Sequence, residues 1–157
     1  MPNFSELFQK FKSNSITYED KTLILTDKFP VQNEENLLIS IEKTNSDCRQ
    51  WLCVDVTGYC ETEGVVFKQG KGIRMLFWED TTLKPVMLKI FSKVGFVQIY
   101  NIWESTDHRG TKSLDSWRYG SAMIVAEIEN GRRYQCNDWH PDENFDDIIF
   151  TVQKLKQ

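Results

Sequence analysis

The sequence predicts an all-β fold, an antiparallel β-sandwich or jelly roll with one short helix at the N-terminus. Short apolar stretches with strand-like alternation recur along the chain, and clusters of Gly, Asn, Asp and Pro separate them. Aromatic residues make up 13% of the 157 residues, which suits the pleated surface of a sheet. Strands do not alternate with long helical segments, so a Rossmann fold or a TIM barrel is excluded. The length fits one domain, residues 1–157.

The helix is expected over residues 4–12. Its apolar residues recur at helical spacing, at Phe4, Leu7, Phe8 and Phe11. Ser5 is the expected N-cap. An apolar stripe of this kind usually packs on the chain's own core, and docking on a partner is the alternative.

The strands are expected in the apolar stretches that follow, at residues 16–18, 22–25, 37–41, 51–56, 65–67, 73–78, 86–91, 96–103, 122–128, 133–136 and 148–152. Two hairpins are predicted by polar turns, one at residues 19–21 and one at residues 92–95. A third is predicted by Asn130-Gly131, the dipeptide typical of tight hairpin turns. Residues 27–36, which include Pro30, and the polar stretch 104–119 are expected to be loops, and a loop of the second length is usually functional or mobile.

Charge and hydropathy exclude several classes of protein. The formal net charge is −4 and no block of basic residues is present, so a nucleic-acid or anionic-membrane binder is not expected. No apolar run reaches the roughly 20 residues of a membrane helix, and no secretory signal is visible. The chain is therefore expected in the cytoplasm, or to leave the cell by a route that the sequence does not show. The four cysteines lack zinc-site spacing and are expected to be reduced.

An acidic loop, residues 137–147, precedes the last expected strand. Clustered carboxylate and amide oxygens are the ligands that calcium prefers, so the loop is a candidate calcium site. Its candidate metal ligands are Asn137, Asp138, Asp142 and Asp146. The alternative is a solvated turn-rich loop, because Asn, Asp and Pro are also the residues of turns.

Two passages of the sequence resemble the galactose-binding-like β-sandwich domains. The first is Thr-Glu-Gly-Val-Val-Phe-Lys-Gln-Gly-Lys-Gly-Ile-Arg at residues 62–74, and the second runs from Gly120 through Tyr-Gln-Cys-Asn-Asp at residues 134–138. The closing loop and last strand are similar to those of the calcium-dependent galactophilic lectins of that group. The resemblance covers residues 57–152, and residues 1–56 have no counterpart in it.

This resemblance implies a calcium ion in the loop, completed by the hydroxyl groups of a bound sugar. Asp138 falls on an aspartate ligand of those lectins, Asp142 on a threonine ligand, and Asp146 on the second of two adjacent asparagine ligands. Phe145 stands at the first of that asparagine pair and has no side-chain oxygen. A shared fold without the metal site is the alternative that this departure leaves open.

Aromatic and polar residues beside the polar loops are candidate ligand-binding residues. They are Trp103, Trp117, Trp139, His140 and Asn144. Aromatic rings at loop edges stack on sugars or anchor protein interfaces, and capping the ends of the core is their alternative role. No nucleophile elbow, P-loop or zinc-protease motif is present, so no enzymatic activity is expected.

The function expected from these observations is that of a non-catalytic binding module. The first hypothesis is carbohydrate binding through residues 137–147, with calcium as the only expected cofactor. The alternative is a protein–protein interaction domain, such as an inhibitor, an immunity-type protein or a subunit of an assembly, without sugar or metal. A homo-oligomer is open under either hypothesis.

Overall fold

The computed structural model is all-β with one short helix, and it describes residues 3–80, 84–116, 120–138 and 144–155. The helix is α1 (Phe4–Phe11). The strands are β1 (Ser15–Tyr18), β2 (Lys21–Ile24), β3 (Asp27–Pro30), β4 (Glu35–Thr44), β5 (Arg49–Thr62), β6 (Val65–Phe67), β7 (Ile73–Trp78), β8 (Val86–Thr106), β9 (Lys112–Asp115), β10 (Ala122–Ile128), β11 (Gly131–Asn137) and β12 (Ile148–Lys154). The predicted fold class, all-β and antiparallel with one N-terminal helix, is confirmed.

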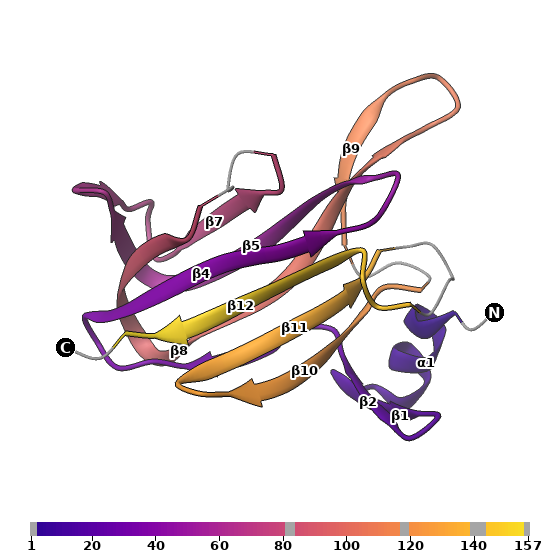
Figure 1. Ribbon diagram of the computed structural model, residues 1–157, viewed down its shortest axis with the longest axis horizontal. Coiled ribbons are helices and arrows are strands. Elements are labelled where there is room, and N and C mark those ends of the chain that lie inside the picture. Colours follow the sequence, from indigo (N-terminus) through magenta and orange to yellow (C-terminus); the bar gives the residue numbers. More distant parts are fainter. Residues whose placement is uncertain (1–2, 81–83, 117–119, 139–143, 156–157) are drawn as a thin grey trace.

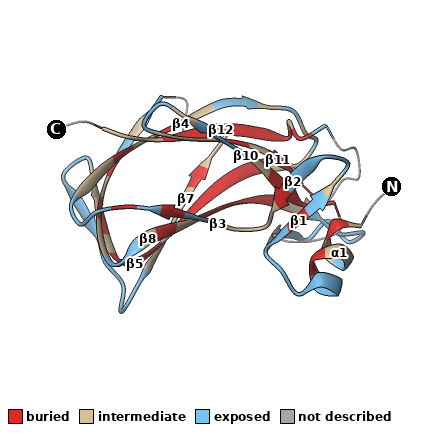
Figure 2. Cartoon of the chain, turned by 90° about the horizontal axis from the view of Figure 1, so that it is seen from below, coloured by how far each residue is buried: buried red, intermediate tan, exposed pale blue. Residues whose placement is uncertain are grey.

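The strands form one continuous antiparallel sheet in the order β1-β2-β10-β11-β12-β4-β8-β5-β6, to which β3 and β9 are added along β8 and β7 along β5 (Figure 1). Figure 2 shows the sheet bent over, so that β10, β11, β12 and β4 lie in one layer and β3, β8 and β5 in the facing layer. Because β4 pairs with both β12 and β8, the two layers belong to one hydrogen-bonded sheet and not to two separate sheets.

Strand β8 belongs to both layers, and its register with β5 shifts at the point where it passes from one layer to the other. Its first half pairs with β4 up to Ile90, and its second half pairs with β3 from Phe96 onward. Between them Ser92 Oγ accepts hydrogen bonds from the amides of Val94 and Gly95. The hairpin predicted at residues 92–95 is therefore wrong: this turn is a bulge inside one strand, and β5 pairs with β8 on both sides of it.

Two segments predicted as loops contain strands. Asp27 and Phe29 are buried on one face of β3, and Pro30 is tolerated because β3 is an edge strand that ends there. Residues 104–116 form a hairpin of β8 and β9 that projects from the body (Figure 1). Asp107 Oδ1 closes its turn by accepting hydrogen bonds from the amides of Arg109 and Thr111, at 2.8 and 2.9 Å. Sequence reasoning missed β9 because three of its four residues are polar, and missed β3 because one of its two buried residues is the charged Asp27.

The main core lies between the two layers and contains inward-facing aliphatic and aromatic side chains of both. A second cluster lies under α1, where Phe4 and Phe8 are buried with Ile16, Leu23, Ala122 and Phe145. The N-cap of α1 is Asn3, whose side chain accepts a hydrogen bond from the Glu6 amide, and not Ser5 as predicted. Within the described residues, no helix is long and apolar enough to cross a membrane.

Candidate functional site

The acidic loop 137–147 connects β11 to β12, and the structure describes its two ends. Asn137 and Asp138 lie at one end and residues 144–147 at the other. Three predicted site residues of this loop, Trp139, His140 and Asp142, lie outside the described residues, as does Trp117.

The first end of the loop is turned into the protein. The Asn137 and Asp138 side chains are fully buried. Asp138 Oδ2 accepts hydrogen bonds from Ser46 Oγ and, at 3.1 Å, from Gln50 Nε2. Asn137 Oδ1 accepts one from the Phe145 amide at 2.7 Å. These oxygens thus hold the loop to the β4–β5 connection and to itself.

The second end of the loop alternates between surface and core. Asn144 is exposed, whereas the ring of Phe145 is buried against Phe4. Phe145 adopts a left-handed backbone with φ of 53°, which is unusual for a bulky residue and is held here by the buried ring and the bond to Asn137. Asp146 Oδ2 accepts a hydrogen bond from Asn45 Nδ2 at 3.0 Å and lies 3.5 Å from Lys43 Nζ.

The calcium that the loop predicts requires six to eight oxygens around one point. Among the described residues, no three His, Cys, Asp or Glu side chains come together as a metal cluster. The described carboxylates instead bind groups of the chain itself, although Asp146 Oδ1 is buried without a hydrogen-bond partner. Calcium at this loop stays a prediction.

A buried polar layer lies beneath the loop and includes Trp103. Gln50 and Trp103 are opposite each other on β5 and β8, both fully buried, so Trp103 presents no ring face to solvent. Asn101 Nδ2 donates to the backbone oxygen of Asn137 across the core, at 2.9 Å. This bond offsets the lost hydration of the Asn101 amide and joins the two sheet layers at this end. Gln50 Oε1, Trp103 Nε1 and Asn137 Nδ2 in the same layer are buried without a hydrogen-bond partner.

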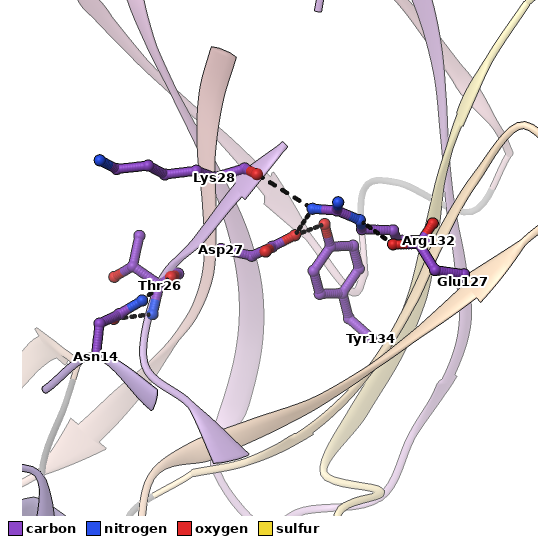
Figure 3. A network of polar contacts seen from close by, with 7 residues as sticks. All are labelled: Asn14, Thr26, Asp27, Lys28, Glu127, Arg132 and Tyr134. Carbon is purple, nitrogen blue, oxygen red and sulfur yellow. Dashed lines mark hydrogen bonds and ion pairs between the residues drawn. The ribbon is translucent and has the colours of Figure 1, made fainter. Parts of the chain in front are cut away.

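A second polar network ties β3 to β11 and is drawn in Figure 3. The buried carboxylate of Asp27 accepts hydrogen bonds from Tyr134 Oη at 2.6 Å and from Arg132 Nη1 at 2.9 Å. Arg132 also binds Glu127 and the backbone oxygen of Lys28. Burial and the neighbouring Asp27 raise the pKa of Tyr134, so the phenol stays a proton donor to Asp27. The network joins the edge strand β3 to the facing layer.

The buried cysteines are not activated thiols. Burial raises the pKa of Cys60 to about 11 and also raises the pKa of Cys53 and Cys136. A nucleophilic cysteine needs the opposite shift, because the thiolate is the reacting form. All four cysteines are free.

A polar groove lies at the other end of β11 from the acidic loop. Its larger part, about 420 Å³, is lined by the β3–β4 connection, the β10–β11 turn and the C-terminal residues, with Gln32, Asn33, Glu34, Glu35, Asn36, Asn130, Lys154 and Leu155. A neighbouring part of about 270 Å³ shares Asn130 and Lys154 and reaches Arg132. Lys154 Nζ lies 3.5 Å from a Glu35 oxygen, so this cation is paired within the groove.

Several exposed apolar side chains lie close together at the end of the sheet, on and beside β6. Its three residues Val65, Val66 and Phe67 are 53%, 55% and 37% exposed, and Met87 at the start of β8 is 52% exposed. Thr62 Oγ1 donates to the backbone oxygen of Met87, which places that residue beside the β5–β6 hairpin. We call these four apolar residues the β6 edge patch.

Sequence reasoning missed the β6 edge patch, although its signal was present. Three apolar residues in a row predict an ordinary strand of the sheet. Such a run between Gly64 and Lys68 also fits an exposed apolar edge, and only the pairing of the strands separates the two cases.

Comparison of the chain with models of protein families, with curated proteins and with solved structures finds no match.

Proposed function

We propose that this chain is a non-catalytic binding module whose partner is a protein, and that it binds this partner through the β6 edge patch. The observation that carries the proposal is the exposure of three apolar side chains on β6, a free edge strand of the sheet, with the exposed Met87 of β8 nearby. Exposed apolar patches at strand edges mark sites where another chain docks or adds a strand.

The composition of β6 supports this choice. Natural proteins cover free edges or place charged residues and Pro on them, because an open apolar edge promotes aggregation. Strand β6 carries no charged residue and no Pro, and the described part of the chain pairs it with β5 alone. A partner that covers the edge gives this arrangement a physical reason.

The described ends of the acidic loop offer few groups to a sugar, which also favours a protein partner. A sugar site needs polar groups and an aromatic face open to solvent. Asn137, Asp138 and Trp103 are buried and hold the chain together, which leaves Asn144 and Asp146 as the described polar residues at the loop surface.

Carbohydrate binding is the second candidate function, and the polar groove favours it. Six of the eight residues that line its larger part carry an amide or carboxylate group, five of them in or next to the β3–β4 connection and the sixth at Asn130. Such planar groups bind the hydroxyls of sugars.

A photo-crosslinking amino acid at position 66 tests the proposal, with position 17 on the opposite edge strand β1 as the matched control. We expect one discrete protein adduct from position 66 and none from position 17. The captured protein is then purified, and Val66→Lys is expected to weaken its binding at least tenfold while Thr17→Lys leaves it unchanged.

Equal affinity of both variants for the captured protein would contradict the proposal, provided that their thermal midpoints match. A glycan array read with and without a chelator tests the second candidate. Binding of a sugar that is lost on Asn130→Ala, with the β6 edge patch intact, would favour the carbohydrate function.

A further inference from the structure

We propose that the partner at the β6 edge patch is a second copy of this chain, which pairs its β6 antiparallel to the first about a two-fold axis at Val66. This inference rests on the proposed function, because it names the protein that the patch binds. It is carried by the backbone, the side chains and the charges of the β5–β6 hairpin.

The backbone of β6 is self-complementary. Glu63 and Gly64 both have positive φ, at 52° and 77°, and form a two-residue turn that closes on the pair Thr62 and Val65. In an antiparallel ladder, successive residues direct their amide and carbonyl groups to opposite sides. Val65 closes the turn with its N–H and C=O directed to β5. The N–H and C=O of Val66 therefore point away from β5, in the plane of the sheet, at its free edge. Two copies related by an axis at Val66 satisfy these groups reciprocally.

The side chains fit the same register. With Val66 opposite Val66 of the second copy, each Val65 lies opposite Phe67 of the other chain. Residues directly opposite in antiparallel strands lie on the same face, and pairs of aromatic and β-branched residues are favourable there. Both faces of β6 are exposed, so apolar residues meet apolar residues on each of them.

The charges at the two ends of β6 select the antiparallel direction. Glu63 precedes the strand and Lys68 follows it, and both are exposed. Antiparallel pairing brings the acidic end of each β6 to the basic end of the other, whereas parallel pairing would bring like charges together. An isologous two-fold contact also closes on itself, so it ends at a dimer and does not continue into a fibre.

Sedimentation velocity of the full chain over a concentration series tests the inference. We expect a dimer that dissociates on dilution. Val66→Lys places two like charges at the axis and is expected to weaken the dimer at least tenfold, whereas Thr17→Lys, on the opposite edge, is expected to leave it unchanged.

Cysteine crosslinking tests the register. Under mild oxidation Val66→Cys is expected to give a disulfide-linked dimer rapidly, because the two positions face each other. Leu114→Cys is the control of similar exposure, and both are compared with the unsubstituted chain, which carries Cys48. Equal crosslinking rates of the two variants would overturn the register.

A wild-type chain that stays monomeric at every concentration would overturn the second copy as partner. A monomeric chain would not by itself contradict the protein-binding function, which the crosslinking at position 66 tests. If position 66 then crosslinks to a different protein, that function stands and only the identity of the partner is wrong. If it crosslinks to no protein, both proposals fail.

Discussion

Asp138 shows how a residue chosen as a metal ligand can serve the fold. Its carboxylate lies beneath the loop and accepts hydrogen bonds from Ser46 and Gln50, which the sequence places 92 and 88 residues away. A carboxylate in a polar loop has the same local sequence whether it binds a cation, faces water or turns inward. Its partners decide its role, and they belong to another part of the chain.

We expect Asp138→Ala to lower the free energy of unfolding by about 2 kcal/mol, because it removes the acceptor of the half-buried Ser46 hydroxyl and one of the two acceptors of the buried Gln50 amide. Asp47→Ala, at an exposed aspartate, should change it by less than about 0.5 kcal/mol. Urea unfolding of the two variants measures this difference. Equal effects of both substitutions would show that Asp138 does not hold the loop.

The cysteines make a second prediction at the level of residues. Cys48 is partly exposed and the other three thiols are fully buried. A thiol reagent such as Ellman's should therefore modify one thiol of the native chain quickly and all four after denaturation. Cys48→Ser should abolish the fast reaction. A fast reaction that persists in this variant would mean that a buried thiol opens to solvent.

At the scale of elements, the bulge opposite Gly58 decides the shape of the sheet. Gly58 has φ of 139°, and a Cβ at this position would lie 1.9 Å from the backbone oxygen of Phe91. The close approach lets β5 stay paired with β8 while the register between them shifts. The sheet can therefore bend between its two layers.

We expect Gly58→Ala to destabilise the chain by about 3 kcal/mol or more, since the clash adds to the backbone strain. Gly64→Ala is the matched control, because its φ of 77° is also positive but nothing lies within 4 Å of the added Cβ. It should cost about 1 kcal/mol. Thermal or urea unfolding separates the two, and a Gly58→Ala variant as stable as Gly64→Ala would remove the bulge from the explanation of the bend.

For the whole molecule, the buried thiols predict a loss of stability at alkaline pH. Burial raises the pKa of Cys60 from 9.0 to about 11. Between these values the unfolded chain releases a proton that the folded chain keeps, so the free energy of unfolding falls as pH rises from 9 to 11. Cys60 alone contributes about 2 kcal/mol to this fall, and Cys53 and Cys136 act in the same direction.

Thermal midpoints measured from pH 8 to 11 test this expectation. Cys60→Ala should make the fall shallower, because one of the linked protons is gone. A Cys60→Ala variant with the slope of the wild type would contradict the linkage.

The sequence by itself determined the fold class and most strand positions. The two-residue alternation of strands and the spacing of Phe4 and Phe8 in α1 are local patterns, set by backbone geometry. Strand β3 escaped this reasoning because its buried Asp27 is stabilised by Arg132 and Tyr134, which the chain brings to it from 105 and 107 residues away.

The tertiary structure decided what the candidate sites are. It turned Asn137 and Asp138 inward, placed Trp103 in the core and left β6 at the free edge of the sheet. The same apolar run would be buried if another strand lay beside β6. Exposure depends on which strands pair, and pairing is a long-range property that no local pattern contains.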